Sequence, residues 1–454
     1  MILSRRQMMG AAAAMGASAM ASRAAMFHVV PGHVLGSGAP SNKLNIAGIG
    51  VGGMGAGNLS QCETENIVAL CDVDSHYAAG TFKRYPKARV YTDFRVMLDK
   101  QKDIDAVVIA TPDHTHAVIA MAAIEAGKHV YCQKPLTHTV HEARRITEAA
   151  RKSNVQTQMG NQGHSGEEIR LLKEWLADGA IGDVREVYAW TDRPVGGDPW
   201  SDFAVRARPT DTPPVPDSLN WDLWLGPAPY RPYHPEYHPL KWRAWLDFGT
   251  GALGDMGCHI LDPAFWALDL GSPKRIWATS THWEKDVSSE TFPRASIVRY
   301  EFPARGDRPP VTLTWSDGRL LPPRPEALEP GRSLPGSGAL FIGDKGCIMH
   351  DCPGASGLRI IPETQMKAYK RPPKTLPRVN TSHEGDWLRA CKDGKPASSS
   401  FEYGGALTET VLLGMVALRA KDQNLDWDAQ AGKFTNNDAA NELLHINYRE
   451  GWRL

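Results

Sequence analysis

Residues 44–55 read LNIAGIGVGGMG, a short apolar run that ends in a cluster of glycines. Such a run is typical of a buried strand in a parallel sheet. Gly50, Gly52 and Gly55 follow with the G-x-G-x-x-G spacing of a dinucleotide-binding turn. The first glycine permits the tight turn, the second lets a phosphate approach the backbone, and the third lets helix and strand pack closely. The stretch therefore predicts a strand, a phosphate-binding turn and a helix.

An acidic residue supports a dinucleotide at this turn. The next predicted strand, residues 67–71, ends at Asp72, twenty residues after Gly52. A carboxylate there accepts hydrogen bonds from ribose hydroxyls and repels a 2′-phosphate, so NAD is favoured over NADP. Gly53 and Met54 belong to the same turn and are predicted to contact the cofactor. A purely structural glycine turn is the alternative, and the flanking strand, helix and acid disfavour it.

The pattern of strand-like and helical segments predicts two domains. Apolar strand-like runs alternate with helical segments up to about Gly160, which indicates a doubly wound parallel sheet of the Rossmann type over residues 44–160. Runs of strands with fewer helices follow, which indicates an α/β domain with an open, largely antiparallel sheet over residues 161–454. The predicted strands of this second part are 184–190, 275–281, 296–302 and 311–315, and its predicted helices are 165–177, 259–268, 384–391 and 407–420.

The N-terminus is predicted to be an export signal rather than part of the folded domains. Arg5-Arg6 and their neighbours resemble the twin-arginine export motif, and a weakly apolar, alanine-rich run follows over residues 10–21. That run is too short for stable membrane insertion, and residues 19–21 offer an A-x-A cleavage site. Residues 1–30 are therefore interpreted as a signal and the start of a linker, with the twin-arginine translocase as partner and the periplasm as destination. A disordered or amphipathic alanine-rich start is the alternative.

Composition excludes some classes of partner. The 454 residues carry 51 basic and 51 acidic side chains, so no basic excess points to nucleic acid or an anionic membrane. The seven cysteines are scattered and odd in number, which fits neither a zinc site nor a disulfide-dense scaffold. No metal is therefore expected.

Lys134 is the first candidate for chemistry. It follows the predicted strand 129–132 and precedes Pro135, and ligands of such sheets sit at the carboxyl ends of the strands. A lysine there can hold a sugar hydroxyl and stabilise a developing alkoxide. Taken alone, it would be an ordinary exposed lysine.

Asp255 and His259 form the second candidate. On a helix, their i,i+4 spacing puts the acid and the imidazole on one face. Histidine is suited to take a proton near neutral pH, and a nearby carboxylate can orient it. A surface ion pair and a pair of metal ligands are the alternatives, although a metal would need a third ligand.

Several motifs occur together in a characteristic order. They are GIGVGGMG, the strand end Cys71-Asp72-Val73-Asp74, Thr111-Pro112-Asp113-His114-Thr115-His116, Ala126-Gly127-Lys128-His129-Val130 with Gln133-Lys134-Pro135, and Gly254-Asp255-Met256-Gly257-Cys258-His259. This order resembles the glucose–fructose oxidoreductase/inositol dehydrogenase (Gfo/Idh/MocA) family over roughly residues 44 to 450. The resemblance implies a Rossmann domain followed by an α/β domain, whose open sheet often forms an interface in homo-oligomers.

The resemblance also implies roles for individual residues. The family's Glu-Lys-Pro motif corresponds to Gln133-Lys134-Pro135, and its Asp-x-x-x-His pair to Asp255 and His259, with the histidine as acid/base and the aspartate orienting it. Gln133 departs from the family glutamate, which puts in doubt any role that needs that carboxylate. The predicted cofactor contacts are completed by Thr111, Pro112, His116, Lys134 and Gln162. Weaker predictions for substrate contact are Asn161, His164, Tyr237, Trp242 and Arg243.

These observations favour an NAD-dependent oxidoreductase acting on CH–OH groups of a carbohydrate. An exported enzyme would meet no useful NAD pool, so the cofactor is expected to be tightly held and regenerated within each cycle. A redox-neutral glycoside hydrolase or lyase, working by transient oxidation and elimination, would use the same residues. A coupled exchange between two sugars is another closed cycle, and a catalytically vestigial sugar-binding protein is the non-enzymatic alternative.

Overall fold

The computed structural model describes residues 42–194, 207–281 and 289–454, and residues 44–454 form one compact unit. The predicted export signal, residues 1–30, lies outside the described residues. Within the described ranges, every helix is too short or too polar to cross a membrane.

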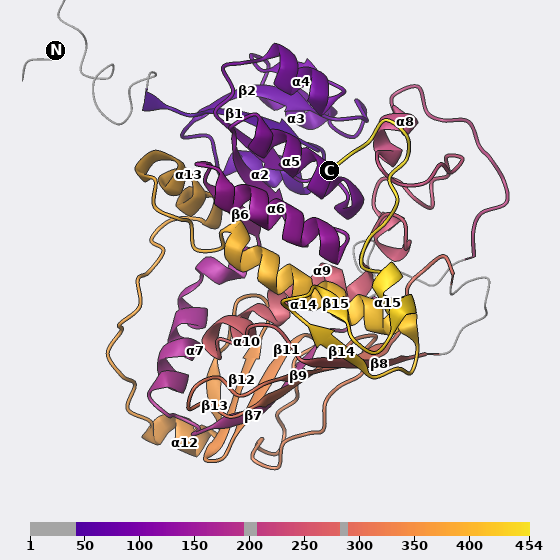
Figure 1. Ribbon diagram of the computed structural model, residues 1–454. Coiled ribbons are helices and arrows are strands. Elements are labelled where there is room, and N and C mark those ends of the chain that lie inside the picture. Colours follow the sequence, from indigo (N-terminus) through magenta and orange to yellow (C-terminus); the bar gives the residue numbers. More distant parts are fainter. Residues whose placement is uncertain (1–41, 195–206, 282–288) are drawn as a thin grey trace, which may run out of the picture. The chain divides into compact units, whose positions relative to one another are not determined.

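The first sheet has six parallel strands in the order β3-β2-β1-β4-β5-β6 (Figure 1). This is the strand order of a Rossmann domain, with its switch point between β1 and β4, and it confirms the predicted fold. The strands are β1 (Asn45–Ile49), β2 (Asn66–Cys71), β3 (Arg89–Tyr91), β4 (Ala106–Ile109), β5 (His129–Gln133) and β6 (Thr157–Gly160). The connecting helices are α2 (Met54–Ser60), α3 (Ala79–Arg84), α4 (Phe94–Lys100), α5 (Asp113–Glu125) and α6 (Val140–Lys152).

Local sequence signals explain several helix boundaries in this domain. Thr139 and Glu142 form a reciprocal capping box at the start of α6, as the sequence predicts. The chain leaves α5 through Gly127, whose φ of +70° is readily adopted by glycine. β4 is buried along its whole length, in keeping with a central strand covered on both faces.

The second sheet has nine strands in the order β13-β12-β11-β7-β10-β9-β8-β14-β15. Among the described strands of this sheet, only the pair β7–β10 is parallel, so the prediction of a largely antiparallel sheet is confirmed. The strands are β7 (Val184–Trp190), β8 (Arg275–Ser280), β9 (Ser296–Phe302), β10 (Val311–Ser316), β11 (Gly338–Gly343), β12 (Gly346–Asp351), β13 (Arg359–Ile361), β14 (Leu425–Asp428) and β15 (Lys433–Phe434). The last five of these strands were not predicted from the sequence.

The helical segments of this second part position the site. They are η3 (Gln162–Ser165), α7 (Glu167–Ala177), α8 (Trp221–Leu225), η4 (Lys241–Ala244), α9 (Gly251–Ile260), α10 (Asp262–Ala267), α12 (Glu363–Ala368), α13 (His383–Asp393), α14 (Phe401–Ala420) and α15 (Asp438–Glu442). The prediction of one helix over 259–268 was wrong, because two helices share this stretch. Helix α9 begins at Gly251 and ends at Ile260, and helix α10 begins at Asp262. Asp255 and His259 therefore share helix α9.

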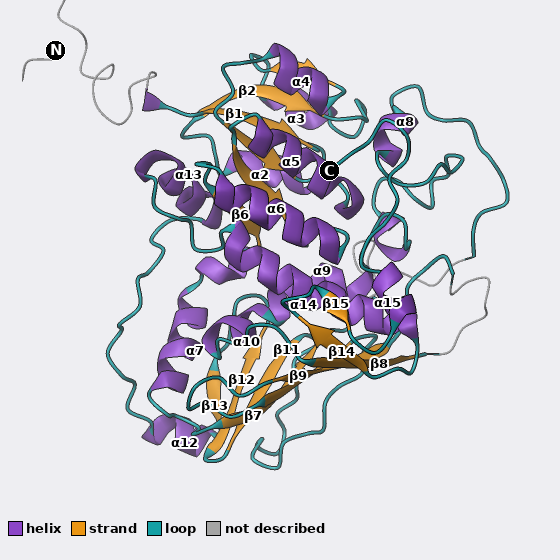
Figure 2. Cartoon of the chain, in the orientation of Figure 1, coloured by secondary structure: helices purple, strands orange, loops and turns teal. Residues whose placement is uncertain are grey.

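Helix α14 packs between the two sheets (Figure 2). It contacts α6 and β6 of the Rossmann domain as well as α9, β8 and β9. Fourteen residues of this helix are buried, at positions that run from Phe401 to Leu418. The two sheets are thus joined through a shared helical layer.

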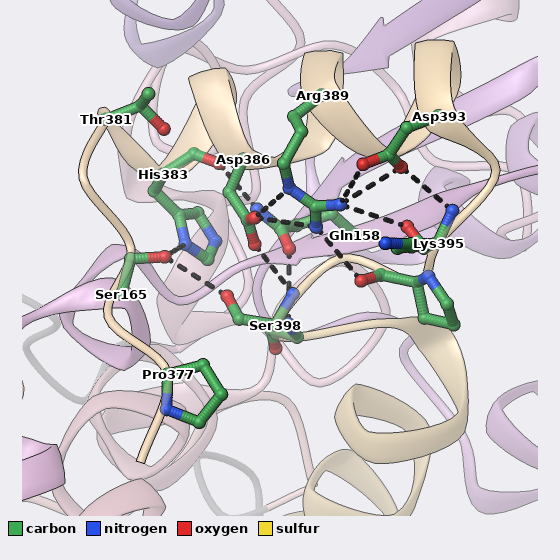
Figure 3. Close-up of polar contacts among 12 residues, drawn as sticks. Gln158, Ser165, Pro377, Thr381, His383, Asp386, Arg389, Asp393, Lys395 and Ser398 are labelled. Carbon is green, nitrogen blue, oxygen red and sulfur yellow. Dashed lines mark hydrogen bonds and ion pairs between the residues drawn. The ribbon is translucent and has the colours of Figure 1, made fainter. Parts of the chain in front are cut away.

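Helix α13 is held on the Rossmann domain by polar contacts (Figure 3). His383 Nδ1 lies 2.6 Å from the Ser165 hydroxyl, and the Gln158 side chain of β6 donates to the His383 carbonyl at 2.6 Å. Asp386 accepts from the Ser398 backbone at 2.7 Å and from Arg389. A helix distant in sequence therefore belongs structurally to the first sheet.

Candidate active site

A cavity of about 670 Å³ lies at the carboxyl ends of β1, β2, β4 and β5 and continues under the second part of the chain. This is where ligands of a doubly wound sheet bind. The lining includes most of the residues singled out in the sequence, namely Gly50, Gly52, Gly53, Met54, Asp72, Thr111, Pro112, His116, Lys134, Gln162, Trp242, Arg243, Asp255 and His259.

The glycine turn is tightly packed between β1 and β4. Gly50 has a φ of +75°, and a side chain there would lie 2.8 Å from the Ala110 backbone. Gly55 is not in the cavity lining, because it approaches the Gly50 carbonyl so closely that a side chain would collide with it. The structure thus gives it the packing role of the third glycine of the motif, and its predicted contact with the cofactor stays a prediction.

Asp72 lies at the end of β2 and is bound to the glycine turn. Its carboxylate accepts backbone N–H groups of Val51 at 2.8 Å, Gly52 at 3.2 Å and Asp74 at 3.0 Å. Burial raises the pKa of Asp72 to about 6, although these three hydrogen bonds oppose the shift. The acid is thus placed beside the phosphate-binding turn, where a ribose would lie.

At the far side of the switch point, Asp255 is surrounded by cations. Lys134 Nζ donates to its carboxylate at 2.8 Å, Arg193 donates to the other carboxylate oxygen, and Arg243 Nε lies 3.4 Å away. Burial would raise the pKa of Asp255, but Lys134, Arg243 and Arg193 together hold it well below its usual range. Arg193 was missed by the sequence analysis because it follows β7 with no motif around it.

His259 lines the cavity one turn after Asp255. Among the described residues, none forms a hydrogen bond with its buried Nδ1. Burial and the neighbouring Lys134 lower the pKa of His259 to about 3, so the imidazole is neutral near pH 7 and has a free lone pair. The contacts of the described residues include no hydrogen bond that His259 donates to Asp255, since that carboxylate is occupied by the three cations.

Asp113 is a further buried acid in the cavity lining that sequence analysis left without a role. It begins α5, and the Thr250 hydroxyl donates to it at 2.5 Å. Burial raises the pKa of Asp113 to about 7, against the hydrogen bond from Thr250 and the charges of Arg243 and Lys134. Its place within the Thr111–His116 motif was the available signal.

His116 connects two strand ends in the site. Its Nδ1 lies 2.8 Å from the Pro135 carbonyl and its Nε2 lies 2.8 Å from the Thr111 carbonyl. The ring therefore ties the end of β4 to the residue that follows Lys134. This makes His116 a positioning residue as well as part of the cavity lining.

The side chain of Gln133 lines the cavity but is committed to a buried network rather than to Lys134. Its amide donates to Asn58 at 2.9 Å, and Asn58 donates to Glu384 of α13 at 2.7 Å. Tyr131 also donates to Glu384, at 3.1 Å. A carboxylate is thus present in this network, but it comes from residue 384 rather than from the position of the family glutamate.

Three predicted substrate contacts lie outside the cavity lining. Asn161 is buried and accepts from the Ser399 hydroxyl at 2.7 Å. His164 is buried against Asp262, with Nδ1 2.9 Å from the carboxylate. Tyr237 is only 3% exposed and packs at 4.8 Å, between ring centroids, from Trp245. Their predicted contact with a substrate stays a prediction.

Trp242 and Arg243 do reach the cavity. The Arg243 guanidinium lies 4.2 Å from the centroid of the Trp242 ring, a cation–π geometry. A flat aromatic face beside hydrogen-bond donors is a surface on which a polyhydroxylated ring can lie.

The residues present fit a dinucleotide. The glycine turn supplies backbone approach, Asp72 supplies a ribose acceptor, and the cavity extends on both sides of the switch point to Lys134 and to Phe94. No cluster of three or more metal-binding side chains occurs in the part of the chain that the structure describes.

Two family models match the chain. Residues 44–161 match the NAD-binding Rossmann fold of the Gfo/Idh/MocA oxidoreductase family, and residues 167–300 match the C-terminal alpha/beta domain of the same family. Together they span more than half of the chain. The chain belongs to the Gfo/Idh/MocA oxidoreductase family. Its first domain is therefore an NAD-binding Rossmann domain.

Curated relatives within the family are similar to part of this chain. Levoglucosan dehydrogenase of Pseudarthrobacter phenanthrenivorans is 28% identical over 196 residues, which cover 43% of this chain and 40% of that protein. Inositol 2-dehydrogenase 2 of Saccharopolyspora erythraea is 35% identical over 144 residues, which cover 31% of this chain and 42% of that protein. The chain thus matches about two fifths of the length of these relatives.

A solved structure supports the fold over a longer range. Levoglucosan dehydrogenase in complex with NADH and L-sorbose aligns with a TM-score of 0.55 at 20% identity, covering 85% of this chain and 98% of that chain. At this identity the likeness concerns the fold alone. It extends over both sheets.

Proposed function

We propose that this protein is an exported, NAD-dependent oxidoreductase that acts on a CH–OH group of a sugar or sugar derivative. The observation that carries the proposal is the cavity, which has Asp72 and the glycine turn on one side of the switch point and Lys134 and His259 on the other. The names of the matched relatives, which are dehydrogenases of levoglucosan and inositol, favour a carbohydrate substrate.

In this proposal His259 is the general base. Its neutral imidazole takes the carbinol proton on a ring nitrogen, and in the reverse direction it returns that proton to the carbonyl oxygen. When bound, NAD supplies a nicotinamide that accepts the hydride from the carbinol carbon. Lys134 stabilises the developing alkoxide through its ammonium group.

Asp255 acts here as a positioning residue for cations. Its contacts with Lys134 and Arg193 fix the ammonium and guanidinium groups at the cavity wall. This differs from the role that the family resemblance implies, in which the aspartate orients the histidine. Asp255 can still stabilise the imidazolium form of His259 through space, because it is one turn away on the same helix.

A tightly held and internally recycled cofactor follows from export. Arg5 and Arg6 favour a route that carries folded proteins, so NAD would be bound before the protein leaves the cytoplasm. Two closed cycles are compatible with this. One is a coupled exchange in which one sugar is oxidised and another reduced.

The other closed cycle is a redox-neutral glycoside hydrolysis or elimination, which the export motif also favours. Oxidation of a carbinol carbon acidifies the neighbouring C–H, so a base can remove that proton while the aglycone leaves. Addition of water and return of the hydride then restore the sugar, with no net change in the cofactor. A vestigial sugar-binding protein is opposed by the presence of Lys134 and His259 together in the cavity.

Product analysis tests these alternatives. The purified protein is first analysed for co-purified NAD, then incubated with a panel of sugars and glycosides, and the products are identified by mass spectrometry. A keto-sugar with reduced cofactor supports the dehydrogenase, a paired keto-sugar and polyol supports the exchange, and a cleaved glycoside without net reduction supports the redox-neutral cycle. The absence of all products contradicts the enzymatic proposal.

Export is tested separately. Replacing Arg5→Lys together with Arg6→Lys is expected to leave the protein in the cytoplasm, since the translocase recognises the paired arginines. The measurement is the periplasmic yield relative to the unmodified chain. An unchanged yield would contradict the proposed route.

We further propose a homo-oligomer formed through the open face of the nine-stranded sheet. Polar and aromatic side chains, among them Arg275, Trp277 and Arg299, line a shallow depression on this sheet. Light scattering of the wild type and of Trp277→Ala tests the interface, with a shift towards the monomer expected for the variant. A monomeric wild type would contradict the proposal.

A further inference from the structure

One wall of the cavity comes from a segment that the family motifs do not include. Trp452 lines the same cavity as the glycine turn and Asp72, although it lies 380 positions after that acid in the sequence. The segment that follows α15, yellow in Figure 1, runs past α8 to the Rossmann domain. A tryptophan from the end of the second part thus meets the first domain.

Trp452 is held in this position by contacts with the start of α4. The centroid of its ring lies 4.5 Å from the Arg95 guanidinium carbon. It lies 6.2 Å from the centroid of the Phe94 ring. Arg95 is in turn fixed by the Asp93 carboxylate at 2.8 Å. The indole is therefore stacked on the beginning of α4.

The segment is also anchored to α8. Arg449 forms an ion pair with the Asp222 carboxylate and donates to the Asp222 carbonyl at 2.8 Å and to the Gly226 carbonyl at 3.2 Å. The Arg449 backbone donates to the Pro227 carbonyl, and the Trp452 backbone donates to the Arg449 carbonyl. These contacts fix the backbone that carries the indole.

The position of Trp452 corresponds to one half of the expected ligand. A dinucleotide crosses the switch point with its pyrophosphate at the glycine turn, and the acid at the end of β2 takes the ribose of the adenosine half. Beyond Asp72, on that side, the cavity is lined by Thr92, Asp93 and Phe94 at the end of β3, together with Trp452. Lys134 and His259 lie on the other side of the switch point.

We infer that Trp452 is a binding residue for the adenine ring, closing the adenosine end of the site with a stacking surface. An indole offers a large flat apolar face. Stacking of a nucleic-acid base on such a face contributes about 1–3 kcal/mol to binding. Thr92 and Asp93 add polar residues to the lining at this end of the cavity. This inference rests on the proposed function, because it deepens the account of how NAD is retained.

The test separates the two halves of the cofactor. The full chain, freed of nucleotide with charcoal, is titrated by calorimetry with ADP-ribose and, separately, with nicotinamide mononucleotide. Trp452→Ala is expected to weaken ADP-ribose binding by about 5- to 150-fold. Binding of nicotinamide mononucleotide should be unchanged, and Trp452→Phe should recover most of the affinity for ADP-ribose.

A matched control excludes a general effect of removing a tryptophan. Trp266 also stacks on a cation, with Lys173 Nζ 4.7 Å from its ring centroid, but it does not line the cavity. Trp266→Ala should leave the affinity for ADP-ribose unchanged. Equal effects of the two variants, or equal losses for both ligands in Trp452→Ala, would overturn the inference.

The amount of NAD that co-purifies with each variant is a second measurement. It is expected to fall in Trp452→Ala and to stay at the wild-type level in Trp266→Ala. Wild-type occupancy in Trp452→Ala would contradict a role in retention. If the wild type itself binds neither NAD nor ADP-ribose, the proposed function fails instead, so the two failures are distinguishable.

Discussion

Two acids lie on either side of the switch point, and they are held by different kinds of partner. Asp255 contacts the side chains of Lys134, Arg193 and Arg243, whereas Asp72 accepts backbone N–H groups from the glycine turn. The pKa of Asp255 is held well below its usual range, and burial raises the pKa of Asp72 to about 6. Cations therefore fix a permanent charge where chemistry is proposed, while amides leave Asp72 able to exchange partners with a ribose.

The largest expected effect is a loss of catalytic activity on the side of the switch point where Asp255 lies. His259→Ala should lower kcat/KM by about a hundred- to ten-thousand-fold, because general acid–base catalysis typically contributes that much. Bound NAD should be retained, since the glycine turn and Asp72 lie on the other side of the switch point. Kinetics combined with cofactor quantification check this. Loss of NAD would assign His259 a structural role, and unchanged kcat/KM would remove it from the chemistry.

The next effect compares the two acids directly. Asp255→Asn should lower the free energy of unfolding by about 3–5 kcal/mol, because removing one partner of a buried ionic cluster leaves its cations uncompensated. Asp72→Asn is the matched control and should cost less, since its amide oxygen can still accept the N–H groups of Val51 and Gly52, which share one carboxylate oxygen. Urea unfolding of both variants measures the difference. Equal losses in the free energy of unfolding would contradict the special cost of leaving the cations around Asp255 without a counter-charge.

A smaller effect concerns the choice of cofactor. Asp72→Ser should weaken NAD binding by about 10- to 100-fold, through loss of charge-assisted hydrogen bonds to the ribose. Asp72→Arg should shift the preference towards NADP, because the negative charge that repels a 2′-phosphate becomes positive. Titrations with both nucleotides give the ratio of affinities. Co-purification of NADP with the unmodified protein would contradict the role of Asp72.

The smallest effect, taken per pH unit, is a change in the pH dependence of stability. The pKa of Asp113 is raised from 3.8 to about 7 by burial, so between these values the folded protein binds more protons than the unfolded chain. Stability contributed by this group is therefore lost as pH rises from about 4 to 7, by at most about 1.4 kcal/mol per pH unit. Asp113→Asn should remove that slope while keeping an acceptor for Thr250. Identical slopes in urea unfolding at pH 5, 6 and 7 would show that Asp113 is ionised throughout.

The first sheet was largely predictable because its signals are local. The glycine turn, the acid at the end of the next strand and the capping box at Thr139 each depend on neighbours in sequence, and all three occur where expected. The hairpin of β11 and β12 was missed although glycines flank both strands, since short apolar runs between proline-rich loops do not distinguish strand from loop.

The site was less predictable because its partners come from distant segments. Lys134, Asp255 and His259 were identified from motifs, but the contact of Arg193 with Asp255 spans 62 positions and that of Lys134 spans 121. No local pattern marks such pairs. The same holds for Trp452, whose position in the cavity depends on the path of the chain after α15.

Glu384 has a consequence for how the protein is made. It accepts from Asn58, 326 positions earlier, and from Tyr131 inside the core of the first sheet. Trp387 and Leu388 of the same helix fill that core as well. During synthesis from the N-terminus, the core of the Rossmann domain therefore stays incomplete until helix α13 has been synthesised. Cofactor loading is accordingly expected after translation has nearly finished rather than on the ribosome, which places folding, loading and any later export in that order.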